Sequence, residues 1–157
     1  MKSFSIVFLL MNILPFASCQ TYPAKMPLDF SIGIGSYGGM TGLSGRTIIS
    51  LDFCLVEEKL VDRILTRYEW KVTEAELEPL YQSLRKLNAF DIKWLAYHGR
   101  EYDSGNTSVI FTVSKKNYRI LESANNRVIS KHVSRYRVML KLIQDFADSF
   151  SRKNENN

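Results

Sequence analysis

Alternation of apolar and polar residues early in the chain constrains the fold most, because side chains of a strand point alternately to its two faces. Phe30, Ile32 and Ile34 share one parity and predict a strand that begins at Asp29. A longer run on one parity predicts a second strand: Thr47, Ile49, Leu51, Phe53 and Leu55. Each predicted strand therefore has one apolar face and one polar face.

The segment 57–72 is consistent with two structures. A helix would align Leu60, Ile64 and Tyr68, whereas a strand would place the same residues on one face with charged residues opposite. The β-branched and aromatic residues and the alternation at its end favour the strand. Glu57-Glu58-Lys59 would then form the turn before it.

Six of the eight glycines lie between Gly33 and Gly45, and the first of them match the pattern G-x-G-x-x-G. A phosphate-binding loop of this kind needs a helix directly after it, because the free N–H groups of the helix bind the anion. Here a strand is predicted instead, so we interpret the glycines as a wide hairpin connection that uses positive φ angles. The connection carries Tyr37, Met40 and Leu43, which either insert into a partner's pocket or fold back over the sheet edge.

A helix is predicted next, because Thr73 and Glu76 have the spacing of a capping box. The apolar residues that follow recur at helical spacing: Leu77, Leu80, Tyr81, Leu84 and Leu87. Asn88 tolerates the left-handed conformation and is the expected stop. Pro79 would remove one hydrogen bond from this helix, unless the regular helix starts there.

The second half of the chain predicts a hairpin and a final helix. Residues 89–106 form an irregular connection, 108–114 and 118–122 form two strands, and Ser134 caps the helix. The helix has an apolar stripe: Tyr136, Met139, Leu140, Ile143, Phe146 and Phe150. The order β-β-β-α-β-β-α predicts one α+β domain over 29–150, with about five antiparallel strands in two hairpin groups and two amphipathic helices on one face.

The N-terminus has the layout of a secretory signal, with Lys2 before an apolar run and small residues after it. Residues 1–18 are therefore predicted to be a signal peptide, which is short for a membrane span. The run ends at Cys19, which in a bacterial lipobox becomes lipidated and anchors the mature chain in the envelope. Ordinary cleavage after Cys19, which would give a secreted soluble protein, is the alternative. Residues 19–28 would be a tether and 151–157 a disordered tail.

No residue set in the sequence matches a catalytic or metal-binding pattern well, so we expect no catalytic site, metal or cofactor. Cys54 lies inside a strand pattern rather than at a helix N-terminus, where its pKa would fall. His98 stands in a polar loop without a full set of metal ligands. A small envelope hydrolase that uses Cys54 or the His98 loop remains an alternative function.

The chain is modestly basic, with a formal net charge of +5 and basic residues enriched between Lys115 and Lys141. Such a surface can bind nucleic acid, anionic lipid or acidic polymers. Nucleic acid is not expected as a partner of an exported protein. We interpret these basic residues as a solvated helix face and a charged turn.

Several short motifs resemble one known family. They are Tyr37-Gly38-Gly39-Met40-Thr41-Gly42-Leu43 leading into Thr47-Ile48-Ile49, the helix start Thr73-Glu74-Ala75-Glu76-Leu77, and the helix end Leu87-Asn88-Ala89-Phe90. With the late hairpin and the terminal helix, this arrangement resembles the emfourins, small bacterial protein inhibitors of thermolysin-like metallopeptidases. It is also similar to many bacterial lipoproteins of the same build. The resemblance implies an inhibitor-like binding protein and assigns no inhibitory residue.

The sequence as a whole predicts a non-enzymatic interaction module, tethered to the membrane through Cys19. Its partner would be a protein, bound through Tyr37, Met40 and Leu43. A second set of candidate contacts lies in the later connection: Trp94, Tyr97 and Tyr102. A structural lipoprotein that binds glycan through exposed aromatic residues is a further alternative.

Overall fold

The computed structural model describes residues 22–96 and 105–155, with side chains up to Phe150. The strands and α-helices are β1 (Ser31–Tyr37), β2 (Leu43–Ser50), β3 (Phe53–Leu60), β4 (Arg63–Trp70), α1 (Glu74–Lys86), β5 (Trp94–Ala96), β6 (Asn106–Val113), β7 (Lys116–Glu122), β8 (Asn126–Val128) and α2 (Val133–Glu155). Short 3-10 helices are η1 (Gly39–Thr41), η2 (Ala89–Asp91) and η3 (Ser130–His132).

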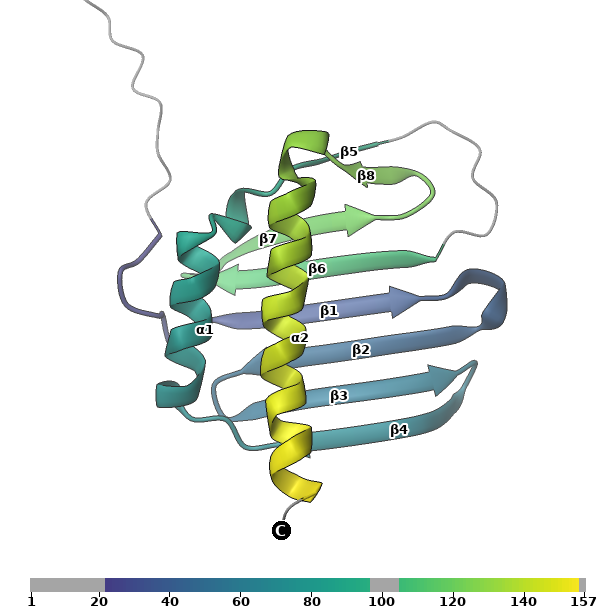
Figure 1. Ribbon diagram of the computed structural model, residues 1–157, viewed down its shortest axis with the longest axis horizontal. Helices are drawn as coiled ribbons and strands as arrows, with labels where there is room; N and C mark the ends of the chain where they lie inside the picture. Colours follow the sequence, from purple (N-terminus) through teal and green to yellow (C-terminus); the bar gives the residue numbers. More distant parts are fainter. Residues whose placement is uncertain (1–21, 97–104, 156–157) are drawn as a thin grey trace, which may run out of the picture.

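The main element is a six-stranded antiparallel sheet in the order β4-β3-β2-β1-β6-β7, and β5 pairs with β8 in a small second sheet. Both helices lie on the same face of the main sheet, and α2 crosses its strands (Figure 1). The meander β1–β4 and the hairpin β6–β7 are the two hairpin groups, joined through β1 and β6. The predicted α+β class is confirmed, with more strands than the sequence analysis finds.

Two tight turns that the sequence analysis misses account for the extra strand of the meander. The predicted second strand over 47–55 is split by a turn in which Asp52 has a φ of 81°. Residues 57–59 lie inside β3 rather than in a turn, and the next turn contains Val61, with a φ of 55°. Neither turn has a glycine at its positive φ position, and glycine is the residue that most clearly marks such a turn. The segment after Val61 is a strand, as predicted.

Helix α1 begins and ends as the sequence predicts. The Thr73 hydroxyl accepts the N–H of Glu76 at 3.4 Å, and the Glu76 carboxylate accepts the N–H of Thr73 at 2.9 Å. Asn88 follows the helix with a φ of 52°, in the left-handed conformation that stops it. Pro79 lies inside the helix, so the regular helix does not start there. Four of the five predicted apolar positions are buried, Leu77, Leu80, Tyr81 and Leu84, and the fifth, Leu87, is partly buried against the core.

Helix α2 buries the predicted apolar stripe against the sheet. Its fully buried members include Tyr136, Met139 and Ile143, and they join one core with residues of the central strands. The helix begins at Val133, one residue before the predicted cap, because η3 leads directly into it. It continues to Glu155, so residues 151–155 are helical where a disordered tail is expected. No glycine or proline interrupts the helix there.

The segment 22–28 packs against the domain, which corrects its assignment to a tether. The Tyr22 ring is 8% exposed, with its centroid 4.8 Å from that of Phe90, and its hydroxyl donates to Asp91 at 2.8 Å. Met26 is 5% exposed and belongs to the same core. An aromatic and a thioether side chain supply enough apolar area to dock a short extended segment. We call residues 22–28 the N-terminal strap.

Candidate functional site

The tips of the β1–β2 and β3–β4 hairpins lie side by side at one end of the main sheet. The N–H of Val61 in one turn donates to the carbonyl of Gly42 in the other, at 2.9 Å. Gly42 has a φ of 66°, which glycine adopts without strain. A Cβ atom at this position would also lie 3.0 Å from Cγ2 of Val61. The contact between the two tips therefore favours glycine at position 42 on two separate grounds.

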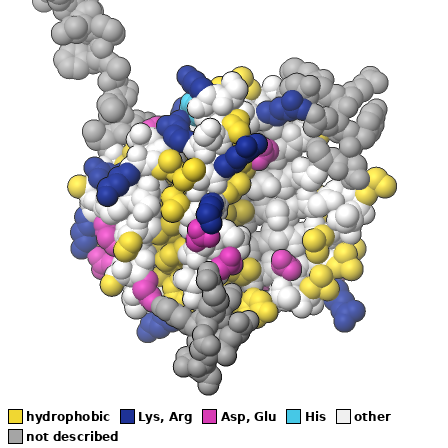
Figure 2. Space-filling view, in the orientation of Figure 1, with side chains coloured by type: hydrophobic (Ala, Val, Ile, Leu, Met, Phe, Trp, Pro, Cys, Tyr) yellow, Lys and Arg dark blue, Asp and Glu magenta, His cyan; other side chains and the backbone are white. Residues whose placement is uncertain are grey.

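Large apolar side chains are exposed on these two tips. We call the following set the hairpin-tip surface: Tyr37, Met40, Leu43, Leu60, Val61 and Ile64. Their exposed fractions range from 44% for Leu43 and Leu60, which are cross-strand partners, to 86% for Met40. Figure 2 shows hydrophobic side chains gathered at the right, where these tips lie in Figure 1. By register, Leu43 and Leu60 point to the helix-covered face of the sheet, whereas Tyr37 and Ile64 point to the opposite face. The six side chains therefore surround this end of the sheet. Apolar side chains exposed together at one end of a folded domain indicate a site of interaction.

The glycine-rich stretch forms strands as well as a turn, which corrects the wide connection expected from the sequence. Only Gly39 and Gly42 have positive φ, and the loop between the strands is confined to residues 38–42. Gly45 lies in β2, where an added Cβ would meet the Ser36 hydroxyl at 2.7 Å. A three-residue 3-10 turn and then β2 follow the G-x-G-x-x-G match, so it lacks the α-helix that a phosphate-binding loop needs.

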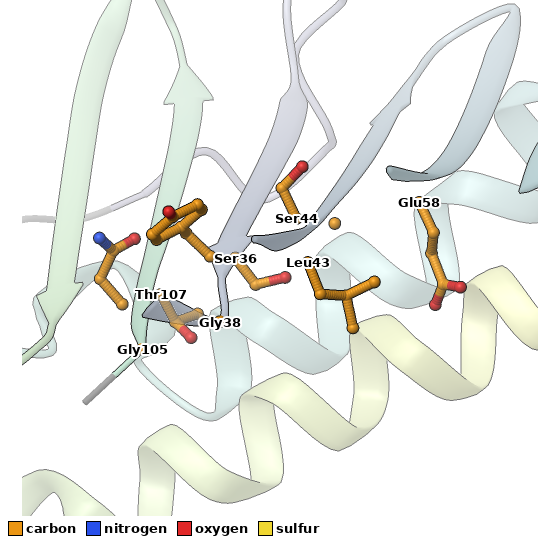
Figure 3. A pocket seen from close by; sticks show the side chains of 10 residues that line it. Ser36, Gly38, Leu43, Ser44, Glu58, Gly105 and Thr107 are labelled. Carbon is orange, nitrogen blue, oxygen red and sulfur yellow. The ribbon is translucent and has the colours of Figure 1, made fainter. Parts of the chain in front are cut away.

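A pocket of about 210 Å³ opens beside the hairpin-tip surface (Figure 3). Its polar lining comes from four strands and includes Ser36, Ser44, Glu58 and Thr107. Leu43 adds an apolar side. Gly45 pairs with both Ser36 and Glu58 in the sheet, and its missing side chain leaves space between them. Hydroxyl and carboxylate oxygens next to an apolar patch can accept hydrogen bonds from a polar or cationic group of a partner.

The face of the sheet that points away from the helices carries a buried carboxylate, Glu57, which is 3% exposed. Its oxygens lie 3.1 Å from Lys59 Nζ, 3.4 Å from Arg67 Nη1 and 3.6 Å from Arg46 Nη2. The hydrogen bond from Lys59, with the charges of Arg46 and Arg67, holds the pKa of Glu57 below its usual range. Because Arg46 and Arg67 are the cross-strand neighbours of Glu57, this cluster joins β2, β3 and β4. We interpret it as part of the fold.

The second set of predicted contacts is only partly described. The indole N–H of Trp94 donates to the carbonyl of Arg119 at 3.0 Å, and its half-buried ring packs against the core. Trp94 therefore stabilises the fold, and little of its ring surface remains for contact with a partner. Tyr97 and Tyr102 lie outside the described residues, as does the proposed lipidation site Cys19.

Cys54 is buried in the core on the helix-covered face of the sheet. Burial raises the pKa of its thiol to about 11, the opposite of what a nucleophilic cysteine needs at neutral pH. His98, the other residue of the hydrolase alternative, lies outside the described residues. His132 is buried, and its Nδ1 accepts the N–H of Lys93 at 2.9 Å.

Half of the hairpin-tip surface is missing from the sequence analysis: Leu60, Val61 and Ile64. The alternation of residue types predicts a single strand that contains all three. Val61-Asp62 is the only local signal of a turn, because aspartate is common in turns. With that turn in place, the three residues come to the sheet end where Met40 lies.

No protein-family model matches the chain, and no curated protein matches it either, so the emfourin resemblance stays a prediction. Among the described residues, no group of three or more His, Cys, Asp or Glu side chains is placed to hold a metal ion. None of the described helices is long and apolar enough to cross a membrane.

Proposed function

We propose that this protein is a non-enzymatic binding module, held at a bacterial membrane outside the cytoplasm by a lipid on Cys19, that binds a protein partner through its hairpin-tip surface. The observation that carries this proposal is the exposure of six large apolar side chains on two adjoining hairpin tips. Single exposed apolar residues are ordinary on a protein surface, but a gathered set is not.

The chemistry of the surface indicates what the partner offers. Met40 is 86% exposed, and a methionine side chain adapts its shape to an apolar pocket. Tyr37 adds a rigid ring with a hydroxyl that can donate or accept a hydrogen bond. Glu58 in the adjoining pocket suits a cationic side chain. We therefore expect an apolar groove flanked by lysine or arginine, and the emfourin resemblance makes a thermolysin-like metallopeptidase the first partner to test.

The test begins with the full chain exported to a bacterial cell envelope and carrying a photo-crosslinking amino acid at position 40. The control carries the same amino acid at position 138. A partner captured at 40 and not at 138 is then purified and titrated with the variant Met40→Ser, Leu43→Ser, Val61→Ser. We expect its affinity to fall by about tenfold or more for each true anchor, because a few central apolar residues carry most of the binding energy.

The matched control replaces three apolar residues exposed elsewhere, Leu28→Ser, Leu95→Ser and Val138→Ser. It should bind as the native protein does, and both triple variants should keep the native thermal midpoint. Equal affinities of the two triple variants would contradict the assignment of the surface. A large fall in the midpoint of the hairpin-tip variant would mean that these side chains stabilise the fold.

The tether is tested separately. The variant Cys19→Ala should lose lipid labelling and membrane retention, because the acyl chains on the cysteine supply the membrane affinity. A native protein found soluble and beginning at Gln20 would overturn the lipid anchor and leave the hairpin-tip surface untouched.

A further inference from the structure

The N-terminal strap limits the distance between the domain and the anchor that the proposed function places at Cys19. Tyr22 is fixed on the domain at two points, because its carbonyl accepts from Arg85 Nε at 3.3 Å and its hydroxyl donates to Asp91 at 2.8 Å. Two residues, Gln20 and Thr21, separate Cys19 from Tyr22. The three steps from one Cα atom to the next span at most about 3.6 Å each in an extended chain, or about 11 Å in all. An anchored domain would therefore lie against the bilayer.

The surface around this point of attachment is basic. We call the following residues the basic end: Arg85, Lys86, Lys93, Lys131 and Arg135. They come from the last turn of α1, the residues after η2, η3 itself and the first turn of α2. Among the described residues, none of these five side chains forms an ion pair with a carboxylate. Lys86, Lys93 and Lys131 are exposed.

Contacts of the buried His132 show that these elements meet. Arg135 Nη2 lies 3.0 Å from His132 Nδ1, which also accepts the N–H of Lys93. The charges of Arg135, Lys131 and Lys93 all act on His132, as does that of Asp91, the partner of Tyr22. In Figure 1, α1 ends and α2 begins in the upper part of the molecule, where Figure 2 shows several Lys and Arg side chains. The strap and the basic end therefore share one side of the domain.

We infer that the basic end rests on an anionic phospholipid bilayer and orients the anchored domain on it. This inference depends on the tether of the proposed function and not on the hairpin-tip surface. Each lysine or arginine near an anionic membrane strengthens binding by about fivefold. A lipid chain and a basic surface are the two signals that together give stable attachment. In this arrangement Lys131 and Arg135 face the anionic lipid headgroups rather than water alone.

The test uses an unlipidated chain that begins at Gln20, which keeps every contact described above. It is sedimented at low salt with vesicles of phosphatidylcholine alone and of phosphatidylcholine mixed with phosphatidylglycerol. We expect binding to the mixed vesicles only, and its loss at high salt, because salt screens the attraction. Replacing Lys86, Lys93 and Lys131 by Gln should weaken this binding by about a hundredfold, from about fivefold per charge.

The matched control removes the same charge at exposed positions elsewhere, with Arg63→Gln, Lys71→Gln and Lys141→Gln. It should bind the mixed vesicles nearly as the native chain does. Equal losses in the two triple variants would mean general charge attraction and would overturn the orientation. Failure of the native chain to bind mixed vesicles at low salt would also overturn it. Neither result bears on partner binding, because the hairpin-tip variant keeps all of these charges.

Discussion

Replacing Tyr22 by alanine tests whether the N-terminal strap is part of the folded domain. The Tyr22 ring is 8% exposed, and its centroid lies 4.8 Å from that of Phe90 and 5.6 Å from that of Tyr118. Truncation of a buried aromatic residue costs about 3–5 kcal/mol. If only Tyr22 itself is released, its backbone regains about 1–2 kcal/mol of entropy. We therefore expect Tyr22→Ala to lower the free energy of unfolding by about 2–3 kcal/mol.

Urea unfolding followed by tryptophan fluorescence measures this loss, and trypsin cleavage after Lys25 measures release of the strap. In the native protein Lys25 is held 3.0 Å from Glu74, so cleavage should become faster in Tyr22→Ala. The control Tyr22→Phe keeps the ring and loses only the hydrogen bond to Asp91, at a cost of about 1 kcal/mol. A stability change below about 0.5 kcal/mol for Tyr22→Ala, with unchanged cleavage, would refute the docked strap and the short distance to the anchor.

Other predictions concern single groups. Thr73→Ala removes the N-cap of α1 and should lower the free energy of unfolding in urea by about 1 kcal/mol. An unchanged midpoint would mean that the capping box does not stabilise the helix. Burial and the charge of Arg135 hold the pKa of His132 below its ordinary 6.5, so the unfolded chain binds the proton first. The free energy of unfolding should then fall as the pH drops below about 6.5, and His132→Asn should flatten this dependence over mildly acidic pH. Burial raises the pKa of Cys54 to about 11, so a thiol reagent at neutral pH should react only as fast as the protein opens; rapid reaction of the folded protein would contradict its burial.

Local signals in the sequence predict the helices and the fold class well. The capping box at Thr73 and the stop at Asn88 depend on residues next to each other in the chain, and both are confirmed. The apolar stripe of α2 is also predicted locally, because its residues recur at helical spacing. A cap at Ser134 predicts a helix that starts at residue 135, two residues after the observed start at Val133. The difference arises because η3 leads directly into α2, and a short 3-10 turn leaves no clear pattern.

The candidate site is harder to predict because it depends on turns without glycine. Asp52 and Val61 adopt positive φ, which tertiary contacts impose: Asp52 exchanges backbone hydrogen bonds with Val72, and Val61 donates to Gly42. Partners so far apart along the chain cannot be paired from local pattern alone. The glycines mark the turn that carries Tyr37, Met40 and Leu43, so the sequence predicts these three as exposed. No glycine marks the second hairpin tip, so the sequence does not predict Leu60, Val61 and Ile64.

The core of the domain connects the two proposed surfaces rigidly. Phe30 joins the strap to β1, because it is 1% exposed and packs on Tyr81 with ring centroids 5.0 Å apart. From there β1 runs under the helices to the loop that carries Met40 (Figure 1). An anchor that holds the strap against a bilayer thereby also sets the height and direction of the hairpin-tip surface. A flexible insert between Cys19 and Tyr22 would free this orientation and leave both surfaces intact. A partner in the same membrane would then be bound less well than before, whereas a soluble partner would be bound equally well, because only the first depends on the height of the tips.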